Sequence, residues 1–167
     1  MDYITHYSSP IGELTLASDG DSLIGLWISG QKYYKATISK ENKEYDELEV
    51  FNFTKKLLDA YFNNEKPLIS DLPLAPRGSD FRKLVWKLLC DITYGETTTY
   101  KELSEKVALI MGKDSMSSQA IGGAVGHNPI SIIIPCHRVI SVNGSLTGYA
   151  GGIDKKITLL KHEGFDI

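Results

Sequence analysis

The sequence has few cysteines and no long apolar run. Only Cys90 and Cys136 occur among its 167 residues, and no stretch reaches the roughly 18 apolar residues that a transmembrane helix needs. The first residues lack a basic region followed by an apolar one, so we expect no secretory signal. Because nothing indicates export, we expect both cysteines to be reduced thiols in the cytoplasm.

Metal-binding patterns are missing as well. Two cysteines are too few for the usual four-ligand zinc cluster unless other residues contribute. His6, His127 and His162 show no metal-ligand spacing with any other residue. We therefore expect no metal ion.

A strong charge of one sign is also absent, since the formal net charge is −3. Residues 1–72 carry 7 lysines and arginines against 12 acidic residues, whereas residues 73–167 carry 11 against 9. An acidic front and a mildly basic back indicate two functional regions. The back is too weakly basic for strong non-specific DNA affinity, so any DNA binding must use few phosphate contacts.

The composition is otherwise that of a folded globular protein, with 42% hydrophobic and 23% charged residues. Alternating apolar and polar residues predict strands at 11–17 and 23–28, and the turn between them predicts a hairpin. We expect a polar loop over 30–44. Apolar residues close to one face predict a helix over 46–63.

From Ser79 onward the pattern becomes helical. Ser79 is a predicted N-cap for an amphipathic helix that extends to Ile92. Thr99 and Glu102 have the spacing of a capping box and predict a second helix. A short third helix over 119–125 follows a turn, and this pair of helices is compatible with a helix-turn-helix.

The last third of the chain is expected to be mixed. Residues 131–134 predict a short, buried extended segment that is stopped by Pro135. Asp154 is the predicted cap of a final helix, and Gly164 its left-handed end. The predicted fold class is therefore α/β (α+β), with a small strand-rich N-terminal domain and a mostly helical C-terminal domain.

A Pro-rich segment over 72–78 is the predicted domain boundary. It divides the chain into a structural domain at 1–75 and a functional domain at 76–167. The alternative is that this segment is a surface loop inside one domain.

The densest group of reactive residue types is the run Pro135-Cys136-His137-Arg138-Val139. A cysteine beside two potential cations is the setting that lowers a thiol pKa and produces a nucleophile. The alternative is that Cys136 is one more buried small hydrophobic residue. Cys90 follows Leu89 on an amphipathic helix, and we interpret it as structural.

His137 is the predicted base for Cys136. In an extended segment adjacent side chains point to opposite faces, so a direct bond would require a turn, and a bridging water could carry the proton instead. A further group must fix the imidazole tautomer. Glu163 at the end of the last helix is a candidate, although spacing alone cannot place it there and by itself favours a solvated helix-end carboxylate.

These residues resemble the active-site signature of the O6-alkylguanine-DNA alkyltransferases, the methylated-DNA–protein-cysteine methyltransferases. The resemblance extends from about Ser79 to Gly164. It includes the glycine-rich stretch 122–129 before the cysteine, the loop 148–152 after it, and the segment 159–164. The first 70 or so residues resemble the variable N-terminal domain of that family only in size and strand content.

The resemblance implies DNA repair by stoichiometric transfer of an alkyl group from O6-alkylguanine, and also O4-alkylthymine, in DNA. Cys136 would be the acceptor, His137 the base acting through water, and Glu163 the carboxylate that orients the histidine. Asn128 would tie the helix-turn-helix to the active-site segment, and Tyr100 would donate a proton to the departing guanine. No cofactor is implied, and the stable thioether would end the activity of each molecule.

The resemblance also implies how DNA is bound. The target base is buried in the duplex, so it must be flipped out. A monomer would bind double-stranded DNA in the minor groove. The implied substrate and DNA contacts are Gln119, Gly122, Gly123, Val125, Gly126, Arg138, Val139, Tyr149 and Ala150.

Three features depart from the family pattern. Gln119 stands where relatives have an intercalating arginine, and Met111 to Met116 looks like an insertion relative to some members. The N-terminal zinc site of some members is not expected, because residues 1–72 contain no cysteine and one histidine.

Two other function classes compete with a suicidal alkyltransferase. A non-enzymatic alkylated-DNA-binding relative typically has tryptophan in place of Cys136, so the cysteine argues against it. A cysteine hydrolase usually has its cysteine and histidine far apart in sequence, so the adjacent pair disfavours it.

Overall fold

The computed structural model describes residues 1–146 and 148–167. They form two compact units, here called the N-terminal unit (Met1–Arg77 with Pro129–Ile133) and the C-terminal unit (Gly78–Asn128 with Ile134–Ile167). The division predicted at 75/76 is a single cut, whereas in the structure residues 129–133 pack with the first unit. The segment directly before the Cys136 run thus belongs to the N-terminal unit.

The N-terminal unit contains a four-stranded sheet in the order β3-β2-β1-β4. Its strands are β1 (Asp2–Ser9), β2 (Gly12–Ser18), β3 (Leu23–Ile28) and β4 (Asn42–Glu44). β1, β2 and β3 are antiparallel, and β4 pairs parallel to β1. The predicted β2–β3 hairpin is confirmed. The loop prediction over 30–44 missed β4, whose three residues are all exposed and lack an apolar alternation.

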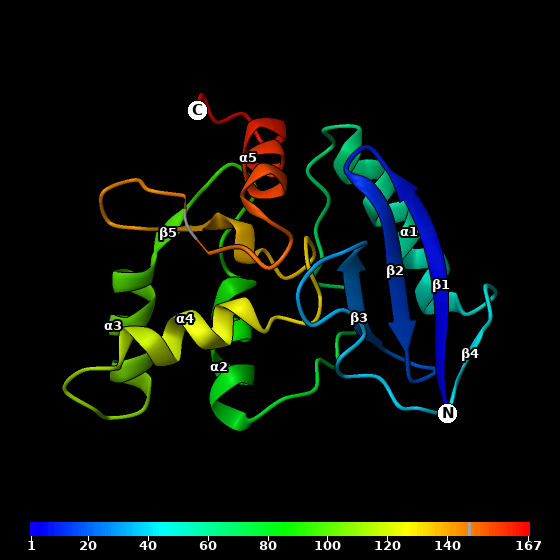
Figure 1. The fold of residues 1–167 in the computed structure, drawn as a ribbon, viewed down its shortest axis with the longest axis horizontal. Coiled ribbons are helices and arrows are strands. Elements are labelled where there is room, and N and C mark those ends of the chain that lie inside the picture. Colours follow the sequence, from blue (N-terminus) through cyan, green and yellow to red (C-terminus); the bar gives the residue numbers. More distant parts are fainter. Residues whose placement is uncertain (147) are drawn as a thin grey trace. The chain divides into compact units, whose positions relative to one another are not determined.

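Helix α1 (Glu49–Phe62) lies along the sheet (Figure 1) and buries Val50, Phe51 and Leu58. The Tyr7 hydroxyl on β1 donates to Asp59 on α1 over 2.5 Å, which ties the helix to the sheet. A separate apolar cluster of Ile4, Ala17, Ile24 and Trp27 completes the core of this unit.

Segment 129–133 is fixed to β3 by backbone hydrogen bonds. The amide of Leu26 donates to the carbonyl of Pro129 over 2.8 Å, and that of Ser131 donates to Leu26 over 2.9 Å. The predicted extended run over 131–134 is wrong in conformation although right in burial. Ile132 has a φ of 70° and residues 131–133 form a turn. An apolar composition indicates only that a segment is buried, and a buried turn can have the same composition as a buried strand.

The C-terminal unit contains helices α2 (Asp80–Leu89), α3 (Tyr100–Ile110), α4 (Ser118–Gly126) and α5 (Ile153–His162). Two short parallel strands, β5 (Thr98–Thr99) and β6 (Val139–Ile140), and a 3₁₀ turn at Cys136–Arg138 connect them. α4 runs crosswise to α2 and α3 (Figure 1). This α3–turn–α4 arrangement is the predicted helix-turn-helix.

The predicted helix starts are largely confirmed. The side chain of Ser79 accepts from the Arg82 amide over 3.2 Å, and that of Thr99 accepts from the Glu102 amide over 3.0 Å. Each bond satisfies a backbone donor that the helix leaves unpaired. The cap predicted at Asp154 is wrong, because α5 begins one residue earlier and Gly152 is its N-cap.

Trp86 organises the core of the C-terminal unit. Its indole Nε1 donates to the carbonyl of Ala124 over 2.7 Å, which joins α2 to α4. A Cβ at Gly78 would lie 2.5 Å from the Trp86 ring, so this position requires glycine. Val85, Leu103 and Ile121 are buried in the same unit.

The ion pair that Arg77 forms with a buried carboxylate of the N-terminal unit yields a stability prediction. Arg77 donates to both carboxylate oxygens of Asp2, at 2.7 and 2.9 Å, and the Asp2 side chain is only 4% exposed. Arg77→Met should therefore lower the free energy of unfolding at pH 7 by about 1–3 kcal/mol, because it leaves a buried carboxylate short of donors.

The effect of Arg77→Met should also depend on pH. The hydrogen bonds from Arg77 hold the pKa of Asp2 below its ordinary value. A carboxyl group whose pKa is lower in the folded than in the unfolded protein stabilises the fold at pH values above its unfolded-state pKa. That stabilisation is lost as the pH falls through the folded-state pKa. Urea unfolding should show the gap between wild type and variant narrowing in acid, and a constant gap would contradict the ion pair. Lys32→Met, at an exposed position, is the control.

Candidate active site

Cys136 lies on a tight turn rather than in an extended segment. Residues 136–138 form one 3₁₀ turn, closed by the amide of Arg138 donating to the carbonyl of Pro135 over 3.0 Å. The expectation of opposite-facing neighbours along an extended chain is therefore wrong here. Cys136 is 4% exposed and His137 is fully buried, so the turn holds both side chains in the interior of the C-terminal unit.

His137 is oriented by Glu163. The imidazole Nε2 lies 2.5 Å from Glu163 Oε2, and both side chains are fully buried. Nδ1 is buried and has no hydrogen-bond partner among the described residues. Because a carboxylate only accepts, Nε2 carries the hydrogen and Nδ1 keeps a lone pair. The neutral ring can then accept a proton at Nδ1.

The two protonation states are set by opposing forces. Burial lowers the pKa of His137 more than its bond to Glu163 raises it, so the ring is neutral at rest. Burial would raise the pKa of Glu163, but its hydrogen bonds with His137 and Arg138 outweigh burial and lower the pKa to about 2. Glu163 therefore remains a carboxylate and does not compete for the proton.

The thiol of Cys136 is not ionised at rest. Burial raises its pKa, while a hydrogen bond from Asn128 and the charge of Lys156 act in the opposite direction. Asn128 also donates to the carbonyl of Ile134 over 2.8 Å. This amide therefore links the end of α4 to the segment that carries the cysteine.

Sequence reasoning missed Lys156. Its side chain is fully buried, and its Nζ donates to the carbonyl of Val139 over 2.6 Å. The same nitrogen lies 5.9 Å from the centre of the Tyr100 ring. Burial lowers the pKa of Lys156 to about 8. Helical spacing places Lys156 on the face of α5 that also carries Leu159, Leu160 and Glu163. This spacing is the sequence signal that could have indicated a buried lysine near the active centre.

Arg138 does not lie at an open surface. Its side chain is 9% exposed, and its Nε and Nη2 donate to the two oxygens of Glu163 over 2.7 and 3.1 Å. Its Nη1 donates to the carbonyl of Ile92 over 2.6 Å. The predicted DNA contact thus has its donors turned inward, because the buried carboxylate attracts them.

The predicted substrate residues outside α4 and the Cys136 turn lie on three segments. Tyr100, at the start of α3, donates its hydroxyl to the carbonyl of Gly148 over 3.4 Å. Tyr149 on that loop is buried and Ala150 is half-buried, while Val139 is fully buried.

Helix α4 has two unlike faces. Ile121, Ala124 and Val125 are buried against the unit's core. The opposite face carries the exposed Gln119 followed by three glycines, and no atom lies within 4 Å of a Cβ built on any of them. That face is lined by Gln119, Gly122, Gly123 and Gly126. A helix face without side chains allows another backbone to approach closely.

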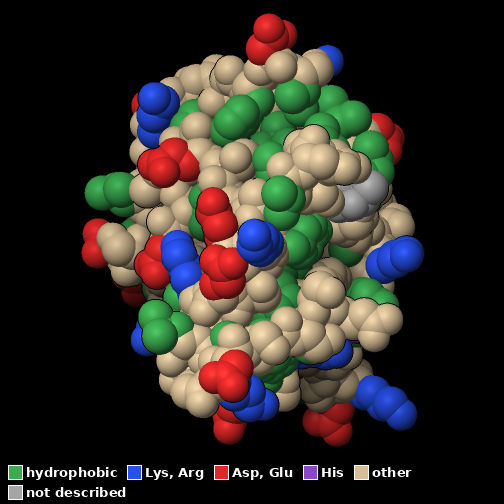
Figure 2. Space-filling view, turned by 90° about the vertical axis from the view of Figure 1, so that its left-hand side faces the viewer, with side chains coloured by type: hydrophobic (Ala, Val, Ile, Leu, Met, Phe, Trp, Pro, Cys, Tyr) green, Lys and Arg blue, Asp and Glu red, His purple; other side chains and the backbone are tan. Residues whose placement is uncertain are grey.

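The face seen in Figure 2 shows no single basic area. Lysine and arginine side chains are interleaved there with aspartate and glutamate, with apolar side chains between them. This agrees with the weakly basic composition of residues 73–167. Few phosphate contacts are available on that face.

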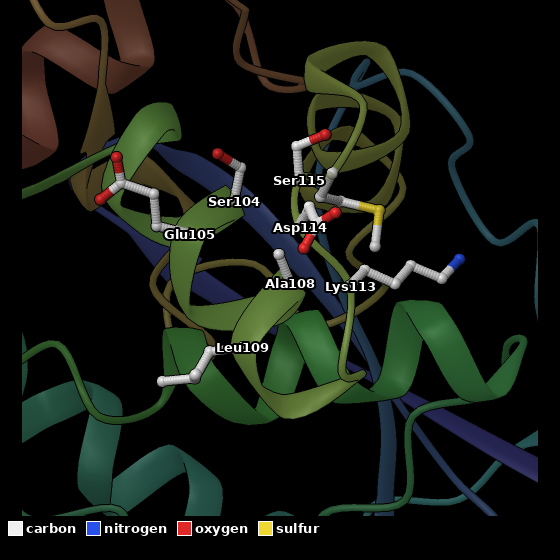
Figure 3. A pocket seen from close by; sticks show the side chains of 8 residues that line it. Ser104, Glu105, Ala108, Leu109, Lys113, Asp114 and Ser115 are labelled. Atoms are coloured by element: carbon white, nitrogen blue, oxygen red, sulfur yellow. The ribbon is translucent and has the colours of Figure 1, made fainter.

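An open hollow of about 440 Å³ lies between α3 and the turn that follows it. Figure 3 shows Ser104 and Glu105 on one side and Lys113 and Asp114 on the other. The hollow is built partly by the segment that looked like an insertion. Its lining contains neither thiol nor imidazole, so it is not the reaction site.

Among residues 1–146 and 148–167, no group of three histidine, cysteine, aspartate or glutamate side chains is arranged to hold a metal ion. No helix in that part of the chain is long and apolar enough to cross a membrane.

Comparison with known proteins gives matches over nearly the whole chain. Residues 3–76 match the family model described as the ribonuclease-like domain of 6-O-methylguanine DNA methyltransferase. Residues 80–165 match the model of its DNA binding domain.

Curated relatives and solved structures agree with these models. The chain is 45% identical to the methylated-DNA–protein-cysteine methyltransferase of Methanosarcina barkeri over 96% of each chain. It is 41% identical to that of Haemophilus influenzae, over 96% of this chain and 86% of the relative. The crystal structure of Mycobacterium tuberculosis OGT in complex with DNA has a TM-score of 0.83 and 40% identity, covering 96% of this chain and 92% of that one.

The thiol on one turn with an oriented imidazole, the two-unit fold and these similarities lead to one conclusion. The chain belongs to the 6-O-methylguanine DNA methyltransferase family.

Proposed function

We propose that this chain repairs DNA by moving an alkyl group from O6-alkylguanine onto its own Cys136. Methyl transfer from DNA to a protein cysteine is the activity named for its relatives. The observation that carries the assignment to Cys136 is that it shares one turn with His137. The imidazole Nδ1 of His137 has no hydrogen-bond partner among the described residues, so it can accept a proton. Cys90 is a poor alternative, because burial and the charge of Asp91 together raise the pKa of its thiol to about 11, whereas at Cys136 a hydrogen bond from Asn128 and the charge of Lys156 act against burial.

The proton of the thiol passes to His137. Nδ1 accepts it through a bridging water, and the resulting imidazolium is stabilised by the Glu163 carboxylate. The thiolate then attacks the alkyl carbon, a carbon–sulfur bond forms, and the bond from that carbon to guanine O6 breaks. The electron pair leaves with the guanine, and Tyr100 supplies the proton that neutralises it.

Backbone groups recognise the base. We propose that the carbonyls of Cys136 and Val139 accept from the guanine amine and that the amide of Ala150 donates to its oxygen. Lys156 already donates to the Val139 carbonyl, which has a second lone pair for the base. Tyr149 and the adjacent loop complete the substrate site.

Helix α4 is the proposed recognition helix. Its glycine face can lie close to the minor-groove backbone, and Gln119 at its start can fill the space left by the flipped base. Val125 acts from the buried face by supporting the helix. The N-terminal unit is assigned a structural role.

The alkylated base is itself the electrophile, so the proposed reaction requires no metal or cofactor. The thioether has no good leaving group, and one molecule therefore acts once, as a monomer on its DNA. The reaction requires a reduced thiol, which fits a reducing compartment such as the cytoplasm. A non-enzymatic lesion-binding role is not favoured, because the chain retains the nucleophile together with its base.

The first prediction concerns the acceptor. After incubation with duplex DNA containing O6-methylguanine, intact-mass analysis should show one methyl group per protein, and peptide analysis should locate it on Cys136. Cys136→Ser should abolish transfer, because a hydroxyl is far harder to ionise than a thiol. Cys90→Ser is the matched control and should react at the native rate. Repeated turnover, or an exchange of the two variants' results, would overturn the assignment.

The second prediction concerns Lys156. Lys156→Met removes the buried cation that favours the thiolate, and single-turnover transfer at pH 7 should slow by about tenfold or more. DNA affinity, measured in the Cys136→Ser background, should stay unchanged. Lys161→Met removes an exposed charge from the same helix and is the control. A rate equal to wild type would show that this charge does not act on the thiol.

The third prediction concerns Gln119. Arginine is a better stacking group than glutamine and carries a charge, so Gln119→Arg should tighten duplex binding and steepen its salt dependence by up to about one charge. The gain in transfer rate should be larger on duplex than on single-stranded DNA, where no stack needs filling. Matched oligonucleotides across a salt series measure both quantities. Equal rate changes on the two substrates would exclude a role in base extrusion.

A further inference from the structure

We infer that Arg138 is a positioning residue for the reaction, acting through Glu163 to keep His137 neutral and able to accept the thiol proton. This inference rests on the proposed function. It replaces the DNA contact that the sequence predicts for Arg138 with a role inside the active centre.

The geometry favours this role. Arg138 donates hydrogen bonds to both carboxylate oxygens of Glu163, at 2.7 and 3.1 Å, and His137 donates to one of these oxygens at 2.5 Å. The bond from Arg138 to the Ile92 carbonyl and the Tyr94 ring 5.8 Å away hold the guanidinium in place. These bonds use three of the five N–H donors of Arg138, and its side chain is only 9% exposed, so it is poorly placed for phosphate recognition at the surface.

Charge balance explains what the arginine does. Cys136, His137, Glu163 and Arg138 together carry no net charge when the proton is on sulfur, and none when it has moved to the imidazole. Proton transfer from thiol to His137 therefore leaves the buried group neutral throughout. This avoids the cost of creating a net charge in a low-dielectric interior.

Without Arg138 the balance changes. Glu163 would be an unneutralised buried carboxylate, and His137 would take a proton from solvent to compensate it. The neutral state of the group would then be a protonated imidazole beside an intact thiol. That state has no lone pair at Nδ1, so the thiol proton would have no acceptor.

Other titratable groups near this centre must be included. α5 contributes Lys156 as well as Glu163, the segment before β5 contributes Tyr94, and α3 contributes Tyr100. The positive charge of Lys156 also lowers the pKa of His137, in the same direction as Arg138. The Nζ of Lys156 donates to the carbonyl of Val139, whereas Arg138 bonds both oxygens of Glu163, so the two cations hold different positions in this centre.

The test compares wild type, Arg138→Met and Arg138→Lys. Single-turnover methyl transfer from an O6-methylguanine duplex is measured from pH 5.5 to 9. Arg138→Met should slow transfer at pH 7 by about tenfold or more and move the acid limb of the rate profile upward by about one pH unit. Arg138→Lys keeps the charge but loses the two-pronged bond, so its acid limb should stay nearer to that of wild type. Arg82→Met, which removes an arginine on α2, should leave the profile unchanged.

Measurements of DNA binding in the Cys136→Ser background distinguish a positioning role of Arg138 from a direct contact with DNA. We expect the affinity and its salt dependence to be the same with and without Arg138. A salt slope reduced by about one charge with an unmoved pH profile would make Arg138 a DNA contact and overturn the inference. An equal loss of rate at every pH would show a merely structural role and overturn it too.

Histidine NMR provides a readout that survives poor folding of the variants. In the wild-type protein, isotope-labelled His137 should be neutral at pH 7 with its hydrogen on Nε2. A protonated ring at that pH would overturn the inference. If wild type transfers no methyl group at all, the proposed function fails, and this outcome is distinct from a failure of the Arg138 variants alone.

Discussion

One buried carboxylate holds the active centre together. Glu163 accepts hydrogen bonds from His137 and Arg138 on the Cys136 turn and from the amide of Gly95, so its donors come from two separate stretches of chain. A carboxylate shielded from water must have its lone pairs satisfied by hydrogen-bond donors. These bonds hold together three segments, which are the end of α5, the Cys136 turn and the segment before β5. The orientation of the imidazole, and with it the reactivity of the thiol, follows from that requirement.

In the proposed function the same unit must also present a surface to DNA, and the two faces of α4 suit both demands. The face carrying Ile121, Ala124 and Val125 is buried, and the Trp86 indole bonds to the Ala124 carbonyl. The other face carries glycines with open space around them. Glycine lowers helix propensity, so tertiary packing of the apolar face must stabilise this helix.

Much of the fold was predictable because local signals agree with the tertiary outcome. Ser79 and Thr99 cap their helices as their side-chain chemistry predicts, and Gly164 ends α5 with a φ of 101°. Strand β4 and the turn around Ile132 were not predictable, since β4 has no apolar alternation and Ile132 adopts a left-handed conformation that a β-branched residue rarely takes. Both are imposed by neighbours far along the chain.

For the active centre, the sequence by itself determined which reactive residue types stand together in the Cys136 run. The resemblance that this run and its following segments carry then predicted the nucleophile, the base and the carboxylate. Only the tertiary structure decided how these groups are arranged. Spacing does not reveal that the chain turns at Cys136, that Arg138 points inward to Glu163, or that Lys156 is buried against Val139. The reason is that hydrogen-bond satisfaction and desolvation act between residues far apart in sequence, and neither can be evaluated until the fold has enclosed them.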